Sequence, residues 1–233
     1  MTHMNVESLT WDSSFFGYNV GKIILTDLCI DTNLLQKKAV GFQLIYLFSP
    51  VRIIEFENYL VDEKILLEMN CTNDHIENET FQLELFDPNK HDFNALRNLA
   101  ISSGEYSRFK IDSNFKNNEF VELYSRWITQ SVEGKSAFEV VVATNQDDEI
   151  LGFITLVKKE KVLEIGLIAV AEKARGKGIA KLLLNYTNEK AISLNISKIQ
   201  VTTQGKNVPA MHLYQSFGFK IKNITYIYHY WNI

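Results

Sequence analysis

A short segment with two glycines has the residue types and the spacing of an anion-binding loop. Arg175-Gly176-Lys177-Gly178-Ile179-Ala180 follows an apolar run and opens a helix predicted from Gly178 to Ser193. Glycine lets the main chain approach a ligand closely, and the first amides of a helix have no partner within it. The helix dipole adds partial positive charge at the same end. We therefore expect the loop to hold an anion, and a pyrophosphate is its natural occupant.

Two common phosphate-binding motifs do not fit this loop. The P-loop pattern GxxxxGK[ST] does not occur in the chain, and the dinucleotide pattern GxGxxG lacks its third glycine after Gly176 and Gly178. The six residues match instead RxxGxA, the form of the loop that holds the pyrophosphate of acetyl-CoA. On these residues alone, an ordinary strand-to-helix turn is the alternative.

A second motif lies downstream and supports the acetyl-CoA interpretation. Residues 207–219 follow the pattern NxxAxxLYxxxGF, in which Asn207 suits a helix N-cap and Gly218 suits the stop before the next strand. With both motifs in this order, the chain resembles the GNAT acetyltransferase family. The resemblance implies an α/β (more narrowly α+β) fold, in which helices flank a mixed, mostly antiparallel central sheet. It also implies acetyl-CoA as co-substrate and no metal ion.

The resemblance assigns the coenzyme to main-chain groups along one strand, loop and helix. The pantetheine arm and the thioester carbonyl are expected at the backbone of four strand residues: Leu167, Ile168, Ala169 and Val170. The pyrophosphate is expected at the six loop residues: Arg175, Gly176, Lys177, Gly178, Ile179 and Ala180. Asn207 completes the predicted coenzyme-binding set.

Two side chains are predicted to move protons. The resemblance makes Tyr214 the general acid that protonates the departing thiolate, although the helix pattern alone favours a packing tyrosine. Glu164, on the strand that leads to the loop, is the candidate general base. Its alternation with neighbouring apolar residues also fits any half-buried strand, and a chain of water molecules is the alternative base. His212 is two positions from Tyr214 on a helix and is expected at the surface.

A looser resemblance covers nearly the whole chain and narrows the acceptor. It rests on four segments: residues 9–17, 106–112, 120–128 and 226–231. These segments look like those of the dTDP-fucosamine N-acetyltransferases of surface-polysaccharide synthesis, and they imply a dTDP-4-amino-4,6-dideoxyhexose as the amine acceptor. Arg108 and Phe109 are then expected to contact the sugar nucleotide. A protein, peptide or small-molecule amine, and a non-catalytic acyl-CoA-binding module, are the alternative functions.

The predicted elements form two domains. Alternating short strands and helices over residues 1–78 predict a small N-terminal α/β domain, ending in the polar loop 72–79. Residues 79–233 are predicted to be the acetyltransferase domain, with the order β-α-α-β-β-β-α-β-α-β-β. The aromatic strand predicted at residues 225–230 fits a homodimer edge and burial within the domain equally well.

Composition excludes several other classes of protein. The formal net charge of −4 argues against binding nucleic acid through bulk electrostatics. Cys29 and Cys71 are far apart and belong to no CxxC pattern, so neither a disulfide scaffold nor a zinc site is expected. No secretory signal and no apolar stretch long enough to span a membrane is evident, so a cytoplasmic location is expected.

Overall fold

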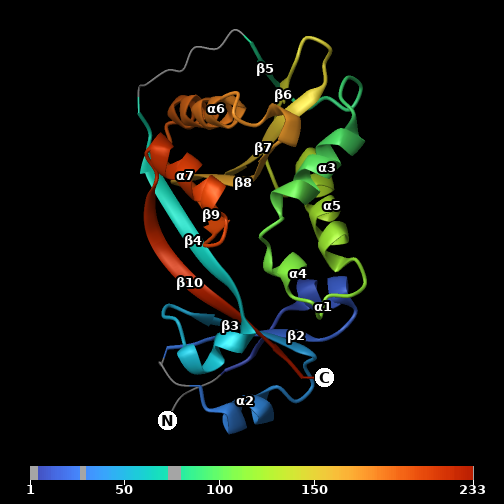
Figure 1. Cartoon of the computed structure of the whole chain (residues 1–233), viewed down its shortest axis with the longest axis vertical. Helices are drawn as coiled ribbons and strands as arrows, with labels where there is room; N and C mark the ends of the chain where they lie inside the picture. The colour runs from blue at the N-terminus through green and yellow to red at the C-terminus, as the bar shows by residue number, and fades with distance from the viewer. Residues whose placement is uncertain (1–4, 27–29, 73–79, 233) are drawn as a thin grey trace. The chain divides into compact units, whose positions relative to one another are not determined.

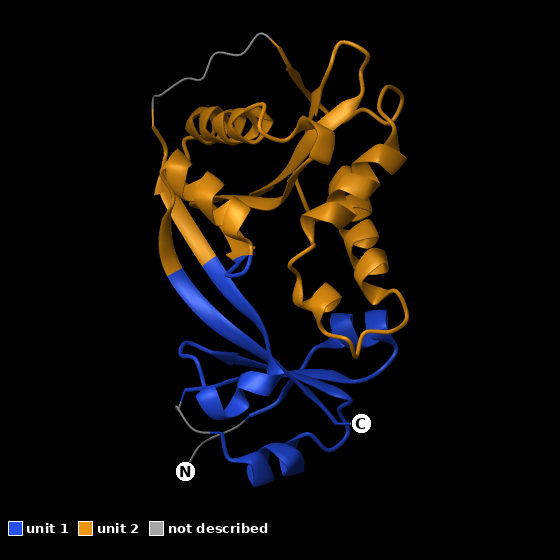
Figure 2. Cartoon of the chain, in the orientation of Figure 1, with its two compact units in different colours: residues 1–65, 204–206, 223–233 blue, residues 66–203, 207–222 orange. Residues whose placement is uncertain are grey.

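The computed structural model describes residues 5–26, 30–72 and 80–232, and the chain divides into two compact units (Figures 1 and 2). Unit 1 comprises residues 1–65, 204–206 and 223–233, and unit 2 comprises residues 66–203 and 207–222. The predicted boundary between residues 78 and 79 falls within the segment 73–79, which lies outside the described residues, as does Cys29. The units instead change within strand β4 (Leu60–Asn70), because β4 and β10 (Lys220–Trp231) contribute residues to both.

Unit 1 is a small sheet with helices. Its elements are, in chain order, β1 (Glu7–Ser8), α1 (Thr10–Phe16), β2 (Val20–Ile24), α2 (Thr32–Lys38), β3 (Leu44–Ser49), the 3-10 helix η1 (Ile54–Tyr59) and the unit 1 parts of β4 and β10. The strand order is β1-β2-β3-β10-β4, in which β2 and β3 are parallel and β10 is antiparallel to β3. A parallel pair needs a crossover connection, which α2 supplies.

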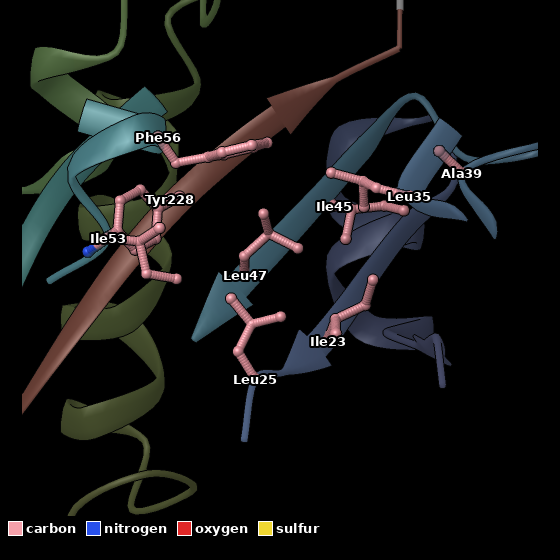
Figure 3. Close-up of a cluster of buried hydrophobic side chains, with 9 residues drawn as sticks. All are labelled: Ile23, Leu25, Leu35, Ala39, Ile45, Leu47, Ile53, Phe56 and Tyr228. Carbon is pink, nitrogen blue, oxygen red and sulfur yellow. The ribbon is translucent and has the colours of Figure 1, made fainter. Parts of the chain in front are cut away.

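The core of unit 1 gathers apolar side chains from these strands and helices. Nine buried residues form it (Figure 3): Ile23, Leu25, Leu35, Ala39, Ile45, Leu47, Ile53, Phe56 and Tyr228. Side chains alternate along a strand, so Ile45 and Leu47 of β3 point into the same core. The Tyr228 hydroxyl accepts a hydrogen bond from the Ile53 N–H at 2.7 Å. The buried hydroxyl oxygen of Tyr228 therefore has a hydrogen-bond partner.

Unit 2 holds both sequence motifs. Its elements are, in chain order, β5 (Gln82–Leu85), α3 (Phe93–Ser103), α4 (Arg108–Ile111), α5 (Glu119–Val132), β6 (Glu139–Thr144), β7 (Ile150–Lys158), β8 (Leu163–Val170), the 3-10 helix η2 (Glu172–Ala174), α6 (Ile179–Ser193), β9 (Lys198–Gln204) and α7 (Val208–Phe217). The strand order is β4-β9-β8-β7-β6-β5. Strands β5 to β8 pair antiparallel, and β8 pairs parallel with β9, so the predicted mixed, mostly antiparallel sheet is confirmed.

Helices cover both faces of the unit 2 sheet. On one face α3 and α5 pack over β6, β7 and β8 around a core that includes Leu96, Ile128 and Phe153. On the other face α6 packs over β7 and β8, with its first residue Ile179 against Gly152. Gly152 and Phe153 are neighbours on one strand, so they face opposite sides of the sheet. The sheet therefore lies between two helical layers, as the resemblance implied.

Several local predictions differ from the structure. The helix predicted at residues 53–60 is the shorter 3-10 helix η1, and the strand predicted at residues 65–69 is part of the longer β4. The two strands predicted at 219–221 and 225–230 are one continuous strand, β10. The polar pair Lys222-Asn223 lies between the two predicted strands, but Lys222 is part of β10 and binds Glu68 of β4. Cross-strand partners thus outweigh the local turn tendency.

Glu68 joins three strands through charged and polar side chains within unit 2. Its carboxylate accepts hydrogen bonds from Lys222 Nζ at 2.6 Å, from Gln200 Nε2 at 2.6 Å and from Lys198 Nζ at 2.9 Å. These donors, the lysine of β10 first, lower the pKa of Glu68 to about 2. A carboxylate whose pKa falls on folding stabilises the folded state above its unfolded pKa and loses that effect as pH falls.

We therefore expect Glu68 to make stability depend on pH on the acid side of neutrality. Its contribution should be complete above pH ~4.5 and shrink toward pH ~2, and solvent screening limits it to about 1 kcal/mol. Denaturant unfolding from pH 6 to pH 3 should show a smaller decline for Glu68→Gln than for the natural chain. The exposed Glu105→Gln is the control and should leave the decline unchanged. If the free energy of unfolding declined with pH by the same amount in Glu68→Gln as in Glu105→Gln, this role of Glu68 would be contradicted.

Candidate active site

The glycine loop has the geometry that anion binding requires. Gly176 and Gly178 adopt positive φ angles of 76° and 87°, and a Cβ at either position would meet nothing within 4 Å. Glycine is thus needed there for its backbone conformation rather than for space. Gly178 is the N-cap of α6, and none of the described side chains caps this helix end. The first hydrogen bond of the helix is Leu182 N–H to Gly178 C=O, so the preceding amides are available to a ligand.

Close packing holds the start of α6 against the sheet. Ile179 is buried on β7, and a Cβ on Gly152 would lie 2.9 Å from the Ile179 Cγ2 atom. A larger residue at position 152 would push the helix start away from the sheet. Lys177 and Gly178 are exposed beside it, and the first turn of the helix contains no acidic residue. The helix end therefore presents amides and positive charge to solvent.

Strands β8 and β9 separate part-way along their length. They pair at Leu163 with Ile199, at Glu164 with Gln200 and at Ile165 with Val201, and their pairing ends there. Residues 166–170 of β8 are partly exposed although this strand is internal to the sheet. The second half of β8 therefore has a main-chain edge that faces an opening rather than a neighbouring strand.

The direction of each amide on this half-strand follows from two hydrogen bonds. Ala171 N–H donates to Leu151 C=O at 2.7 Å, and Leu167 N–H donates to Thr155 Oγ1 at 2.8 Å, so both amides face β7. Amide direction alternates along a strand, so Ile168 and Val170 direct their amides away from β7, toward the opening. The amides of Leu167 and, by the same alternation, Ala169 are directed to β7.

The amide directions reduce the number of β8 residues whose main chain could contact the coenzyme. Of the four strand residues, Ile168 and Val170 have outward main-chain groups, whereas Leu167 and Ala169 do not. The prediction for Leu167 is corrected because its N–H is already bound to Thr155 Oγ1. Arg175 Nε lies 3.4 Å from the Val170 carbonyl oxygen, which ties the loop to the end of β8.

Tyr214 is buried on α7, which packs against α6. The Asn207 side chain accepts a hydrogen bond from Ala210 N–H at 3.2 Å, so Asn207 caps α7 as the sequence predicts. Gly218, at a φ of 111°, ends the helix. Burial raises the pKa of Tyr214 well above its usual range, so its hydroxyl is protonated at neutral pH. Among the described residues none hydrogen-bonds to this hydroxyl, which leaves the proton for a ligand.

Glu164 lies one residue before the last pair between β8 and β9, so it is close to the opening. Its carboxylate forms an ion pair with Lys159 of the β7–β8 turn and is half-buried. To accept a proton from the acceptor amine, the carboxylate would have to break its ion pair with Lys159 or accept the proton while that pair is kept. The role of Glu164 as general base stays a prediction. His212 is exposed, as the sequence predicts.

The two predicted acceptor-binding residues lie on the one-turn helix α4, where the sequence predicts a loop. The Ser107 side chain caps this helix by accepting from Phe109 N–H at 3.3 Å. Phe109 is buried, with its ring centroid 5.5 Å from that of Phe115 and 6.3 Å from that of Trp127. The guanidinium carbon of Arg108 lies 4.4 Å from the centroid of the Phe109 ring. Phe109 thus packs beneath Arg108, while Arg108 is half-buried.

The described part of the chain contains no group of three or more His, Cys, Asp or Glu residues placed to hold a metal ion. None of its helices is long and apolar enough to cross a membrane.

Comparisons with known proteins identify a family for the part of the chain that contains both motifs. The sequence model of the acetyltransferase (GNAT) family matches residues 104–219, which include the glycine loop, β8, β9 and Tyr214. The chain belongs to the GNAT acetyltransferase superfamily. A GCN5-related N-acetyltransferase from Sphaerobacter thermophilus has a similar fold, with a TM-score of 0.59 at 13% identity over 98% of this chain and 76% of that one.

Two curated relatives are similar in sequence to this GNAT chain. The spore coat polysaccharide biosynthesis protein SpsD of Bacillus subtilis (strain 168) is 28% identical over 148 residues, which are 64% of this chain and 50% of SpsD. A streptothricin acetyltransferase of Escherichia coli is 32% identical over 36% of this chain and 58% of the relative. The chain therefore matches about half the length of these relatives.

Proposed function

We propose that this GNAT protein is an acetyl-CoA-dependent N-acetyltransferase whose acceptor is the amine of a nucleotide-linked amino-deoxysugar, of the dTDP-4-amino-4,6-dideoxyhexose type. The observation that carries the acetyl-transfer part is the opening between β8 and β9, which leads to the uncapped start of α6. Outward amides at Ile168 and Val170 suit the pantetheine arm and the thioester. The amides of Gly178 to Ala180 suit the pyrophosphate, with Arg175 and Lys177 adding charge.

The proposed reaction is direct transfer within a ternary complex. The neutral amine nitrogen attacks the thioester carbonyl carbon, and a carbon–nitrogen bond forms as the carbon–sulfur bond breaks. Outward amides stabilise the carbonyl oxygen as it gains negative charge. Tyr214 donates its hydroxyl proton to the departing thiolate. The proton that the acceptor amine loses goes to Glu164 or to a chain of water molecules. Holding both substrates in one place supplies much of the rate.

Two observations support the acceptor class. The resemblance to sugar-nucleotide N-acetyltransferases extends through both units of the chain, and SpsD is named for polysaccharide biosynthesis. Synthesis of such a surface polymer from nucleotide-activated sugars agrees with a cytoplasmic location. The streptothricin acetyltransferase match favours, as the alternative, a small-molecule amine.

The proposal is tested by measuring thiol release from acetyl-CoA with a panel of acceptors. The panel contains dTDP-4-amino-4,6-dideoxyhexoses, the same nucleotides with a hydroxyl in place of the amine, peptides with free α-amines, and small amines. We expect turnover with an amino-sugar nucleotide, none with its hydroxyl counterpart, and an N-acetyl product by mass and NMR. Turnover confined to peptides or small amines would retain acetyl transfer and overturn the acceptor. Acetyl-CoA binding without turnover on any amine would identify a non-catalytic module.

Arg108 provides a sharper test of the nucleotide. A guanidinium suits a diphosphate, because its planar donors match pairs of phosphate oxygens. Arg108→Ala should raise KM for the sugar nucleotide about tenfold to hundredfold and change KM for acetyl-CoA by less than about threefold. Initial rates with each substrate varied in turn provide the measurement. The neighbouring exposed Lys110→Ala is the matched control. Equal changes in both KM values for Arg108→Ala would count against the assignment.

A further inference from the structure

Strand β8 contains an extra residue at the place where it leaves β9. The register between β7 and β8 shifts between Ile154 and Leu156 of β7. Thr155 of β7 therefore lies opposite two residues of β8, Gly166 and Leu167, which is the arrangement of a β-bulge. A bulge removes one regular ladder hydrogen bond and increases the local twist of its strand.

The Thr155 hydroxyl takes the place of the lost ladder partner. Leu167 N–H donates to Thr155 Oγ1 at 2.8 Å, and Thr155 is only 2% exposed. Water therefore has little access to replace this acceptor. A buried amide without a partner destabilises the folded state, so the hydroxyl is a strong constraint on the position of Leu167.

Gly166 is matched to the same hydroxyl. A Cβ at position 166 would lie 2.7 Å from Thr155 Oγ1, closer than real Cβ contacts come. The bulge therefore combines a residue without a side chain on one strand with a hydroxyl on the other. Thr155 is a polar residue within the largely apolar strand 150–157, and that break in the apolar pattern is the signal by which sequence could have found it.

The bulge lies where the coenzyme site begins. The last pair between β8 and β9 is Ile165 with Val201, one residue before Gly166. The added twist there turns the rest of β8 away from β9, which directs the amides of Ile168 and Val170 into the opening.

We infer that Thr155 is a positioning residue for acetyl transfer: its buried hydroxyl fixes the bulge that aims the outward amides of β8 at the acetyl-CoA thioester. The inference rests on the proposed acetyl transfer. Thr155 acts through Leu167 and the strand, and it contacts neither substrate in this role.

Thr155→Val removes the acceptor and keeps the shape of the side chain. We expect kcat to fall about tenfold to hundredfold, more than KM for acetyl-CoA rises, because the aligned amides act most strongly on the transition state. Thr155→Ser keeps the oxygen and should restore kcat to within about threefold of the natural chain. Thr144→Val is the matched control, because Thr144 is a buried threonine of neighbouring β6, and it should leave kcat unchanged. A folded Thr155→Val with natural kcat, or a Thr155→Ser as slow as Thr155→Val, would overturn the inference.

A second measurement needs no amine acceptor and so separates this inference from the proposed function. Hydrogen exchange followed by NMR should show the Leu167 amide exchanging at least tenfold faster in Thr155→Val than in the natural chain or Thr155→Ser. Isothermal titration should show weaker binding of acetyl-CoA by Thr155→Val. If the natural chain binds acetyl-CoA but acetylates no amine, the proposed function fails while these two results still decide the role of Thr155. Unchanged exchange at Leu167 would overturn that role.

The pair can also be tested if Thr155→Val does not fold. Gly166→Ala alone should lower acetyl-CoA affinity strongly, since its methyl group collides with Thr155 Oγ1. In a Thr155→Ala background that collision is relieved, so Gly166→Ala should lower acetyl-CoA affinity by a smaller factor there. Equal factors in both backgrounds would overturn the coupling of the two residues.

Discussion

Replacing Tyr214 with phenylalanine is expected to lower kcat by roughly tenfold to a thousandfold while acetyl-CoA affinity stays within about twofold of the natural value. The substitution removes the oxygen that is proposed to protonate the thiolate and keeps the ring that packs against Phe219 at 5.6 Å between centroids. Stability should change little, because none of the described residues hydrogen-bonds to the Tyr214 hydroxyl. Steady-state rates, isothermal titration with acetyl-CoA and thermal unfolding supply the three measurements.

Tyr186→Phe is the matched control for this prediction. Tyr186 lies on α6, is part-buried and donates its hydroxyl to Glu139 at 3.1 Å, outside the proposed machinery. Its substitution should leave kcat unchanged. Loss of kcat in both variants would indicate a general effect of removing a buried hydroxyl, and natural kcat in Tyr214→Phe would remove Tyr214 from the mechanism.

The environment of Tyr214 also predicts the alkaline behaviour of the enzyme. Burial raises the pKa of Tyr214, so its proton stays in place to higher pH than that of an ordinary tyrosine, whose pKa is about 10. A general acid is active while protonated, so the kcat profile should show no decline due to Tyr214 up to about pH 10.

The glycine loop and its helix were predictable because their determinants are local. Two glycines, flanking basic residues and the start of an apolar helix are consecutive in the sequence, and a positive φ is something glycine provides by itself. The cap of α7 is local in the same way, since Asn207 binds an amide three residues later. These features were predicted at the residues where the structure has them.

The parts that were not predicted depend on pairing between distant segments. The separation of β8 from β9 and the bulge opposite Thr155 arise from how three strands align, and the residues of one strand do not record that alignment. For the same reason Leu167 was grouped with its neighbours, although its amide faces the other way. Unit 1 is discontinuous because β10 returns to it from the end of the chain, which a division into consecutive domains could not represent.

Phe109 illustrates a further limit of sequence reasoning. An aromatic residue beside an arginine is typical both of a stacking surface and of a packed core. The structure places its ring among Phe115 and Trp127, where it supports Arg108 from below. The burial of Phe109 is determined by the helices packed around it. The sequence alone therefore could not distinguish a stacking role from a packing role.

The start of α6 allows helix stability and coenzyme binding to be changed in opposite directions. Ala180 lies in the first turn, where the helix has no acidic residue and no side-chain cap among the described residues. Ala180→Asp places a carboxylate beside the positive end of the helix dipole, which should stabilise the free protein by about 0.3–1 kcal/mol. The same carboxylate lies where the coenzyme pyrophosphate is proposed to bind, so acetyl-CoA affinity should fall roughly a hundredfold.

Ala180→Asn separates the charge from the shape, because its side chain has nearly the same size without the negative charge. It should weaken acetyl-CoA binding much less than Ala180→Asp, and the difference should shrink between 0.1 M and 1 M salt as charge is screened. Thermal unfolding without ligand and isothermal titration with acetyl-CoA measure the two effects. Equal losses of affinity in both variants would show that position 180 acts through shape alone. Natural affinity in Ala180→Asp would mean that the phosphates bind elsewhere, because a helix end occupied by its own carboxylate cannot also hold a pyrophosphate without strong repulsion.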